Sequence, residues 1–181
     1  LTANAVVGIF PAASKNEDIL VFADSERSSI AATLHMLRNQ ERKTDSGSNG
    51  SLADFIAPVD TNRQDYIGLF SATAGIGVEE LTNKYNERKD EYHSLLVKIL
   101  ADRLAEAFAE LLHQKVKDEL WGFSEGSNGI RPAFGYPVCP AHSEKQIAFS
   151  LLTAETNTGA QLTESTTMNT AASVCGLYFA N

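Results

Sequence analysis

The chain has 181 residues, of which 43% are hydrophobic and 21% are charged. This length and composition are typical of one folded domain that buries its own core without disulfides. The formal net charge of −8 argues against nucleic acid or an anionic membrane surface as a partner. The chain shows neither an apolar run long enough to span a bilayer nor a signal-peptide pattern. Cys139 and Cys175 fit no zinc or redox spacing, so we expect a cytoplasmic protein with reduced thiols.

The N-terminal part is predicted to form a strand pair followed by a helix. Apolar, β-branched runs at 5–10 and 18–23 flank a turn-rich connection, which is typical of an antiparallel pair. Asp24 or Ser25 is a suitable N-cap for a helix that extends to Lys43. The spacing that predicts this helix places three apolar residues on one face: Ile30, Leu34 and Leu37.

The middle of the chain changes from strand to helix patterns. Residues 44–51 are polar and rich in glycine, which predicts a loop. Residues 52–58 and 66–74 are short apolar runs that we interpret as buried strands. Residues 77–120 have helical periodicity, and we expect one long helix or two helices with a bend near 93–95.

The C-terminal part is predicted to contain a short helix and a final strand. Ser143 and Gln146 have the spacing of a capping box and indicate the start of a helix that Gly159 ends. Residues 174–179 are predicted as the last strand. Because strands come in pairs and helices are not interposed one by one, the order favours an α+β fold. We expect a twisted antiparallel sheet flanked by helices rather than a doubly wound parallel sheet.

The segment 129–145 contains three of the five prolines in the chain. Proline fixes φ and donates no backbone hydrogen bond, so this segment is predicted to be a stiff, extended loop. Such a loop would hold Arg131, Gly135 and Tyr136 in a defined relation. Arginine can bind a carboxylate with two parallel hydrogen bonds, and glycine lets a ligand approach the backbone. The residues alone leave two alternatives, a site for a small anionic group or a rigid turn with a surface arginine.

Motifs for other chemistry are missing from the sequence. It contains no G-x-S-x-G elbow, no phosphate-binding glycine loop, no H-E-x-x-H and no paired-cysteine metal site. We therefore predict neither a catalytic residue nor a metal ligand. The histidines are scattered along the chain: His35, His93, His113 and His142.

The segment 131–145 resembles the signature of the activation domain of cobalamin-dependent methionine synthase. That signature is Arg-x-x-x-Gly-Tyr within R-P-A-P-G-Y-P-x-x-P-D-H-T-E-K, and the chain has R-P-A-F-G-Y-P-V-C-P-A-H-S-E-K. Further blocks match the family in its order along nearly the whole chain: 6–12, 52–58, 65–68, 100–110, 121–122, 162–165 and 172–179.

The resemblance implies a mostly antiparallel twisted sheet and S-adenosylmethionine as the ligand. It identifies Arg131, Gly135 and Tyr136 as ligand contacts, with Arg131 suited to the methionyl carboxylate. It also places Ala133 near the adenosine. Glu106 matches an acidic residue near the site, where a carboxylate could complement the ammonium or sulfonium charge of the ligand. The alternative for Glu106 is a solvated residue on a long helix.

The function implied by the resemblance is reactivation of methionine synthase, the 5-methyltetrahydrofolate–homocysteine methyltransferase. The domain presents the methyl donor to cobalamin that is bound by a partner domain and has been oxidised to cob(II)alamin. A flavodoxin-like protein or a flavoprotein reductase supplies the electron. The isolated domain would lack complete activity. The alternative hypothesis is a stand-alone or degenerate binding module without methyl transfer.

The chain also departs from the family pattern. Phe134 replaces the second proline of the signature, and Ala141 and Ser143 replace Asp and Thr. Family segments that flank both ends of the site are missing from residues 1–181. We therefore expect a single activation domain that is a fragment of a larger multidomain chain.

Overall fold

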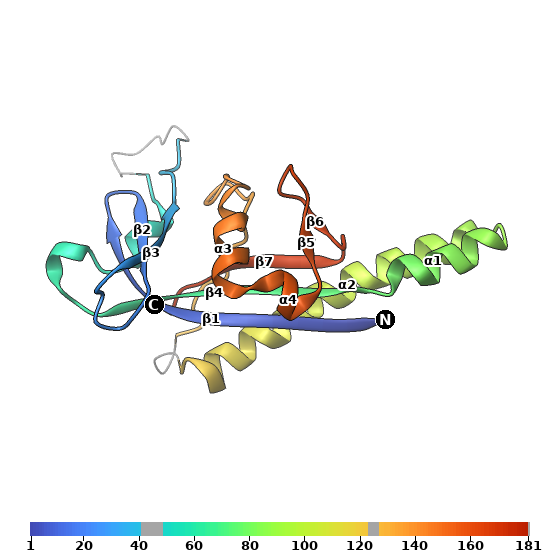
Figure 1. Cartoon of the computed structure of the whole chain (residues 1–181), viewed down its shortest axis with the longest axis horizontal. Helices are drawn as coiled ribbons and strands as arrows, with labels where there is room; N and C mark the ends of the chain where they lie inside the picture. Colours follow the sequence, from blue (N-terminus) through green and yellow to red (C-terminus); the bar gives the residue numbers. More distant parts are fainter. Residues whose placement is uncertain (41–48, 123–126, 181) are drawn as a thin grey trace.

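The structure is a computed structural model that describes residues 1–40, 49–122 and 127–180. Within these residues the centre of the molecule is a five-stranded antiparallel sheet of order β3-β2-β1-β4-β7 (Figure 1). The sheet confirms the predicted α+β class. Its strands are β1 (Thr2–Lys15), β2 (Asp18–Phe22), β3 (Ile30–His35), β4 (Asp65–Ile76) and β7 (Ser173–Tyr178).

The helices cover both faces of the sheet (Figure 1). Alternate residues of β4 divide between two cores, as the period of two in a strand requires. Ile67 and Leu69 pack in the cluster that holds α3 and α4, whereas Phe70 and Ala72 pack with α2. The helices are α1 (Val78–Glu87), α2 (Glu91–Lys115), α3 (Glu144–Leu152) and α4 (Ala154–Thr158), with a π-helical turn η3 (Val116–Leu120) after α2.

The predicted helical region 77–120 is confirmed, but its break lies elsewhere. α1 ends at Glu87 and α2 begins at Glu91, so the break precedes the expected bend at 93–95. Asp90 fixes the start of α2, because its carboxylate accepts a hydrogen bond from His93 N at 3.1 Å and caps the helix.

Two predictions, one in the N-terminal part and one in the middle of the chain, are wrong. The segment 24–43 is predicted to be a helix, yet its described part contains strand β3, and Leu34 in this strand and Met36 directly after it are both fully buried. Burial at a spacing of two fits a strand, and β2 supplies the partner edge. The predicted strand at 52–58 is instead the 3₁₀ helix η1 (Leu52–Phe55). Most of the loop predicted at 44–51 lies outside the described residues.

The capping box lies at a different helix from the one predicted. Ser51 and Asp54 form the reciprocal pair at η1, whereas the Ser143 side chain makes no capping hydrogen bond at α3. The helix at α3 and the last strand at β7 are confirmed. A 3₁₀ turn η2 (Val59–Thr61) and a two-stranded hairpin, β5 (Gln161–Leu162) with β6 (Met168–Asn169), complete the described elements. None of the described helices has the length and hydropathy needed to cross a membrane.

Candidate functional site

The first part of the proline-rich loop runs along the outer edge of β7. Ile130 and Phe179 exchange backbone hydrogen bonds of 2.9 and 3.1 Å, and Leu177 N donates to Pro132 O at 2.9 Å. Proline needs no acceptor for its own nitrogen, so it suits an edge position of this kind. A Cβ at Gly176 would lie 2.5 Å from Pro132 O, so glycine permits this close approach. The backbone of the loop is therefore fixed to the sheet on both sides of Arg131.

A tight turn follows and carries the other residues of the signature. Gly135 N donates to Cys139 O, and Cys139 N donates to Tyr136 O, each at 2.8 Å. Gly135 has a φ of +93°, and a Cβ there would lie 2.1 Å from Cε1 of the His142 ring. Both the conformation and the space select glycine. Phe134, which replaces the family's proline, has 3% exposure and joins the core.

A cleft of about 420 Å³ opens beside this loop, a volume within the range of small-molecule sites. It brings together four of the five predicted site residues: Glu106, Arg131, Ala133 and Tyr136. Gly135, the fifth, lies in the turn next to Tyr136 and does not itself line the cleft. The rest of the lining is formed by Pro132, Phe134, Val138, Lys145, Met168, Ser173, Val174 and Cys175.

Arg131 retains hydrogen-bond donors for a ligand. Its side chain is 19% exposed, and its Nη2 lies 3.3 Å from Oε2 of Glu110, which is 71% exposed. Its Cζ lies 5.8 Å from the centroid of the Phe70 ring. An ion pair with so exposed a carboxylate adds little stability. In the part of the chain that the structure describes, this one hydrogen bond leaves further N–H donors of the guanidinium without a partner.

The cleft carries charges of both signs. Glu106 lies on α2, one helical turn before Glu110, whereas Arg131 and Lys145 provide positive charges from the loop and from α3. Tyr136 and Val138 are 63% and 47% exposed. This arrangement suits a ligand that has both a carboxylate and a cationic group.

Sequence reasoning did not identify several lining residues. Lys145 stood at the end of the matched signature without a role, and its position in the first turn of a predicted helix beside that loop was the available signal. Val174 lies in the matched block 172–179, which gave it no role, and Met168 carries no motif.

Both cysteines are free and buried, as expected for reduced thiols. Burial raises the pKa of Cys139 and of Cys175 to about 12, so neither thiol ionises near neutral pH. The described residues also contain no group of three or more His, Cys, Asp or Glu side chains that could hold a metal ion.

The fold and the cleft together define an α+β domain with a candidate ligand site at one edge of an antiparallel sheet. Over residues 1–181 the chain matches the family described as "Vitamin B12 dependent methionine synthase, activation domain". Among solved structures it is similar to a MetH reactivation domain bound to AdoHcy, with 43% sequence identity and a TM-score of 0.92. The alignment covers 98% of this chain and 58% of that one. The chain belongs to the activation-domain family of vitamin B12-dependent methionine synthases.

Proposed function

We propose that this chain binds S-adenosylmethionine in the cleft and presents the methyl group for reductive methylation of cob(II)alamin. The cobalamin is held by another domain of methionine synthase, of which this chain is one part. One observation carries the proposal. The cleft gathers Arg131, Ala133, Tyr136 and Glu106 in a chain that is 43% identical to a reactivation domain solved with AdoHcy.

The residues of the cleft have complementary roles in this proposal. Arg131 binds the methionyl carboxylate through N–H donors that Glu110 does not use. Glu106 provides the opposing negative charge for the cationic part of the ligand. Ala133 and Tyr136 line the side that receives the adenosine, and Gly135 gives the turn that carries Tyr136 its left-handed conformation and leaves room for the His142 ring.

Methyl transfer in this proposal requires position rather than a catalytic side chain. Cobalamin held by the partner domain would supply the methyl acceptor once a flavodoxin-like protein or a flavoprotein reductase had supplied an electron, and AdoHcy would be the leaving product. Tyr136 and Val138 are exposed beside the cleft, which leaves that side open to a partner domain. Holding the donor in a fixed orientation lowers the entropic cost of the transfer. The isolated chain therefore binds the methyl donor without completing the reaction.

Calorimetric titration with S-adenosylmethionine and with AdoHcy tests the proposal. The unmutated chain should bind both ligands, and Arg131→Ala should weaken binding at least tenfold, because a charge-assisted contact of about 1.5–3 kcal/mol is lost. Arg131→Lys keeps the charge but not the planar guanidinium, so its affinity should lie between that of the unmutated chain and that of Arg131→Ala.

Arg88→Ala is the matched control, since Arg88 is exposed at the end of α1 and does not line the cleft. Absence of binding by the unmutated chain would overturn the proposed ligand, and unchanged binding by Arg131→Ala would overturn the role of that arginine. A stand-alone binding module would give the same binding but no reactivation when added to an inactive methionine synthase that lacks this domain.

A further inference from the structure

Lys145 connects two walls of the cleft. It lies in the first turn of α3, and its side chain lines the cleft. Its Nζ lies 2.9 Å from Nδ1 of His142 and 3.3 Å from the carbonyl oxygen of Thr166. These two acceptors belong to different segments, the signature loop and the tip of the β5–β6 hairpin.

The contact with His142 supports the turn that carries Tyr136. The His142 ring lies so close to Gly135 that a Cβ there would lie within 2.9 Å of three ring atoms. An ammonium group can only donate, so in this contact Lys145 is the donor and the His142 ring is the acceptor. Lys145 therefore holds the ring in the position that supports the turn.

The contact with Thr166 supports the opposite wall. β5 and β6 pair through only two residue pairs, Gln161 with Asn169 and Leu162 with Met168. So short a hairpin has little stability of its own. Thr166 is 8% exposed, and its carbonyl accepts from Lys145 beside Met168, which lines the cleft. The lysine thus fixes a weakly paired hairpin to the rest of the site.

We infer that Lys145 is a positioning residue that holds the Gly135–Tyr136 turn and the β5–β6 hairpin at the spacing that the ligand requires. The inference rests on the proposed function for its effect on binding, but the two contacts exist without the ligand. A hydrogen bond to a charged group is worth more than a neutral one, and Lys145 makes two of them. Loss of both hydrogen bonds would free the turn and the hairpin at the same time.

The test is Lys145→Met, which keeps the length of the side chain and removes its charge and donors. We expect the affinity for AdoHcy to fall about tenfold in calorimetry. Hydrogen exchange of the ligand-free chain should become at least fivefold faster at the amides of Gly135, Cys139, Thr163 and Thr166. The amides of α2 should exchange as before.

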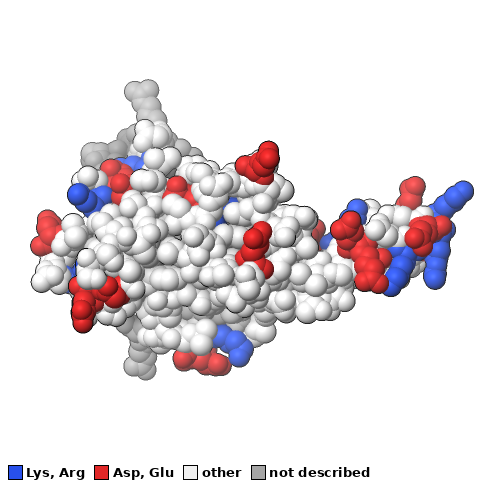
Figure 2. Space-filling model, in the orientation of Figure 1, with Lys and Arg blue, Asp and Glu red and all other residues white. Residues whose placement is uncertain are grey.

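Two further variants make the result specific. Lys145→Arg retains the positive charge and the donors and should bring the affinity back to within about threefold of the unmutated chain. Lys84→Met removes a lysine from α1, in the charged helical arm that extends from the body of the molecule (Figure 2), and should change neither measurement.

Each outcome separates the inference from the proposed function. If the unmutated chain does not bind AdoHcy, the proposed function fails, and hydrogen exchange still tests the positioning role. Unchanged exchange in Lys145→Met overturns that role, even if affinity falls, because the lysine would then act on the ligand directly. Failure of Lys145→Arg to restore affinity would also overturn it.

Discussion

At the scale of single residues, one carboxylate lines the cleft together with two cationic side chains, and Glu106 supplies that carboxylate. S-adenosylmethionine carries a sulfonium and therefore one more positive charge than AdoHcy. A carboxylate at this position should favour the more cationic ligand. Glu106→Gln is expected to lower the affinity for S-adenosylmethionine about tenfold and the affinity for AdoHcy about threefold, as measured by calorimetry.

Glu87→Gln is a suitable control because Glu87 is exposed at the end of α1 and does not line the cleft. If Glu106→Gln bound both ligands as the unmutated chain does, Glu106 would be a solvated helix residue without a role in binding.

The residue scale also shows how far the sequence can define a site. Arg131 and Tyr136 belong to one short signature, and Glu106 belongs to another matched block, so the family resemblance pointed to all three. The contact of Lys145 with Thr166 joins residues that are 21 positions apart. It depends on how the chain returns after α4, which no local pattern encodes. The supporting residues of the cleft were for this reason not predictable.

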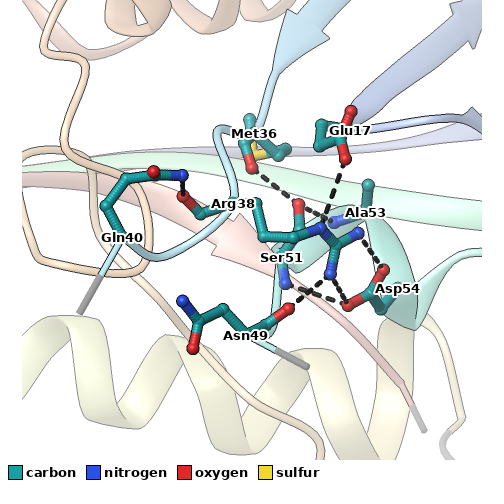
Figure 3. A network of polar contacts seen from close by, with 8 residues as sticks. All are labelled: Glu17, Met36, Arg38, Gln40, Asn49, Ser51, Ala53 and Asp54. Atoms are coloured by element: carbon teal, nitrogen blue, oxygen red, sulfur yellow. Dashed lines mark hydrogen bonds and ion pairs between the residues drawn. The ribbon is translucent and has the colours of Figure 1, made fainter. Parts of the chain in front are cut away.

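At the scale of elements, an arginine holds together the segment that was mispredicted most (Figure 3). Arg38 donates from both terminal nitrogens to the carboxylate of Asp54 at 2.8 Å, and it also contacts Glu17 and the carbonyl of Asn49. Ser51 donates to Met36 O at 2.6 Å within the same network. These contacts link the end of β3, the start of η1 and the β1–β2 turn.

The spacing of apolar residues in this region was compatible with a helix, but tertiary contacts decide otherwise. Ile30 and Leu37, two members of the predicted helical face, are each 55% exposed. Leu34 is buried in the core on one face of the sheet, and His35 N donates to the carboxylate of Glu144 from α3 at 2.9 Å. A partner strand and a distant carboxylate outweigh a weak local preference.

The Arg38–Asp54 pair gives this element a defined pH dependence. Hydrogen bonding from Arg38 lowers the pKa of Asp54 below its usual value. A lowered pKa stabilises the folded state above the unfolded value of about 3.9, and this stabilisation is lost as the pH falls through the folded pKa. Arg38→Met should therefore lower the Tm at pH 7, and the difference from the unmutated chain should shrink below about pH 4.

Thermal unfolding followed by circular dichroism from pH 3 to pH 7 measures this effect. Arg38→Lys retains the charge without the bidentate geometry and should recover part of the Tm difference. A difference in Tm that does not change with pH would show that Arg38 acts through packing rather than through Asp54.

At the scale of the whole molecule, the cleft forms where the two helical layers meet at the β7 edge of the sheet. Glu106 comes from α2 on one face, whereas Lys145 comes from α3, whose side chains pack with the opposite core. The loop with Arg131 runs along the edge between them. The site therefore depends on the distance of each layer from the sheet. The sequence predicted a sheet flanked by helices, but the meeting point of the two helical layers follows from the strand order, which places β7 at the edge beside β4.

Small residues set the distance between α2 and the sheet. Ala101, Ala105 and Ala109 recur every four residues, and each has at most 2% exposure. They let the helix lie close to β4 and β7, since a larger side chain would separate the two surfaces. Ala105 directly precedes Glu106, so the same packing places the carboxylate at the cleft.

Ala105→Leu should accordingly lower both stability and binding. Overpacking is expected to reduce the free energy of unfolding by about 2 kcal/mol, measured by urea denaturation. Affinity for AdoHcy should fall about fivefold as the helix carries Glu106 away from Arg131. Ala107→Leu, at an exposed position of the same helix, adds the same atoms and should change stability by no more than about 0.5 kcal/mol. Equal effects of the two substitutions would contradict the close packing of α2 as the feature that positions Glu106.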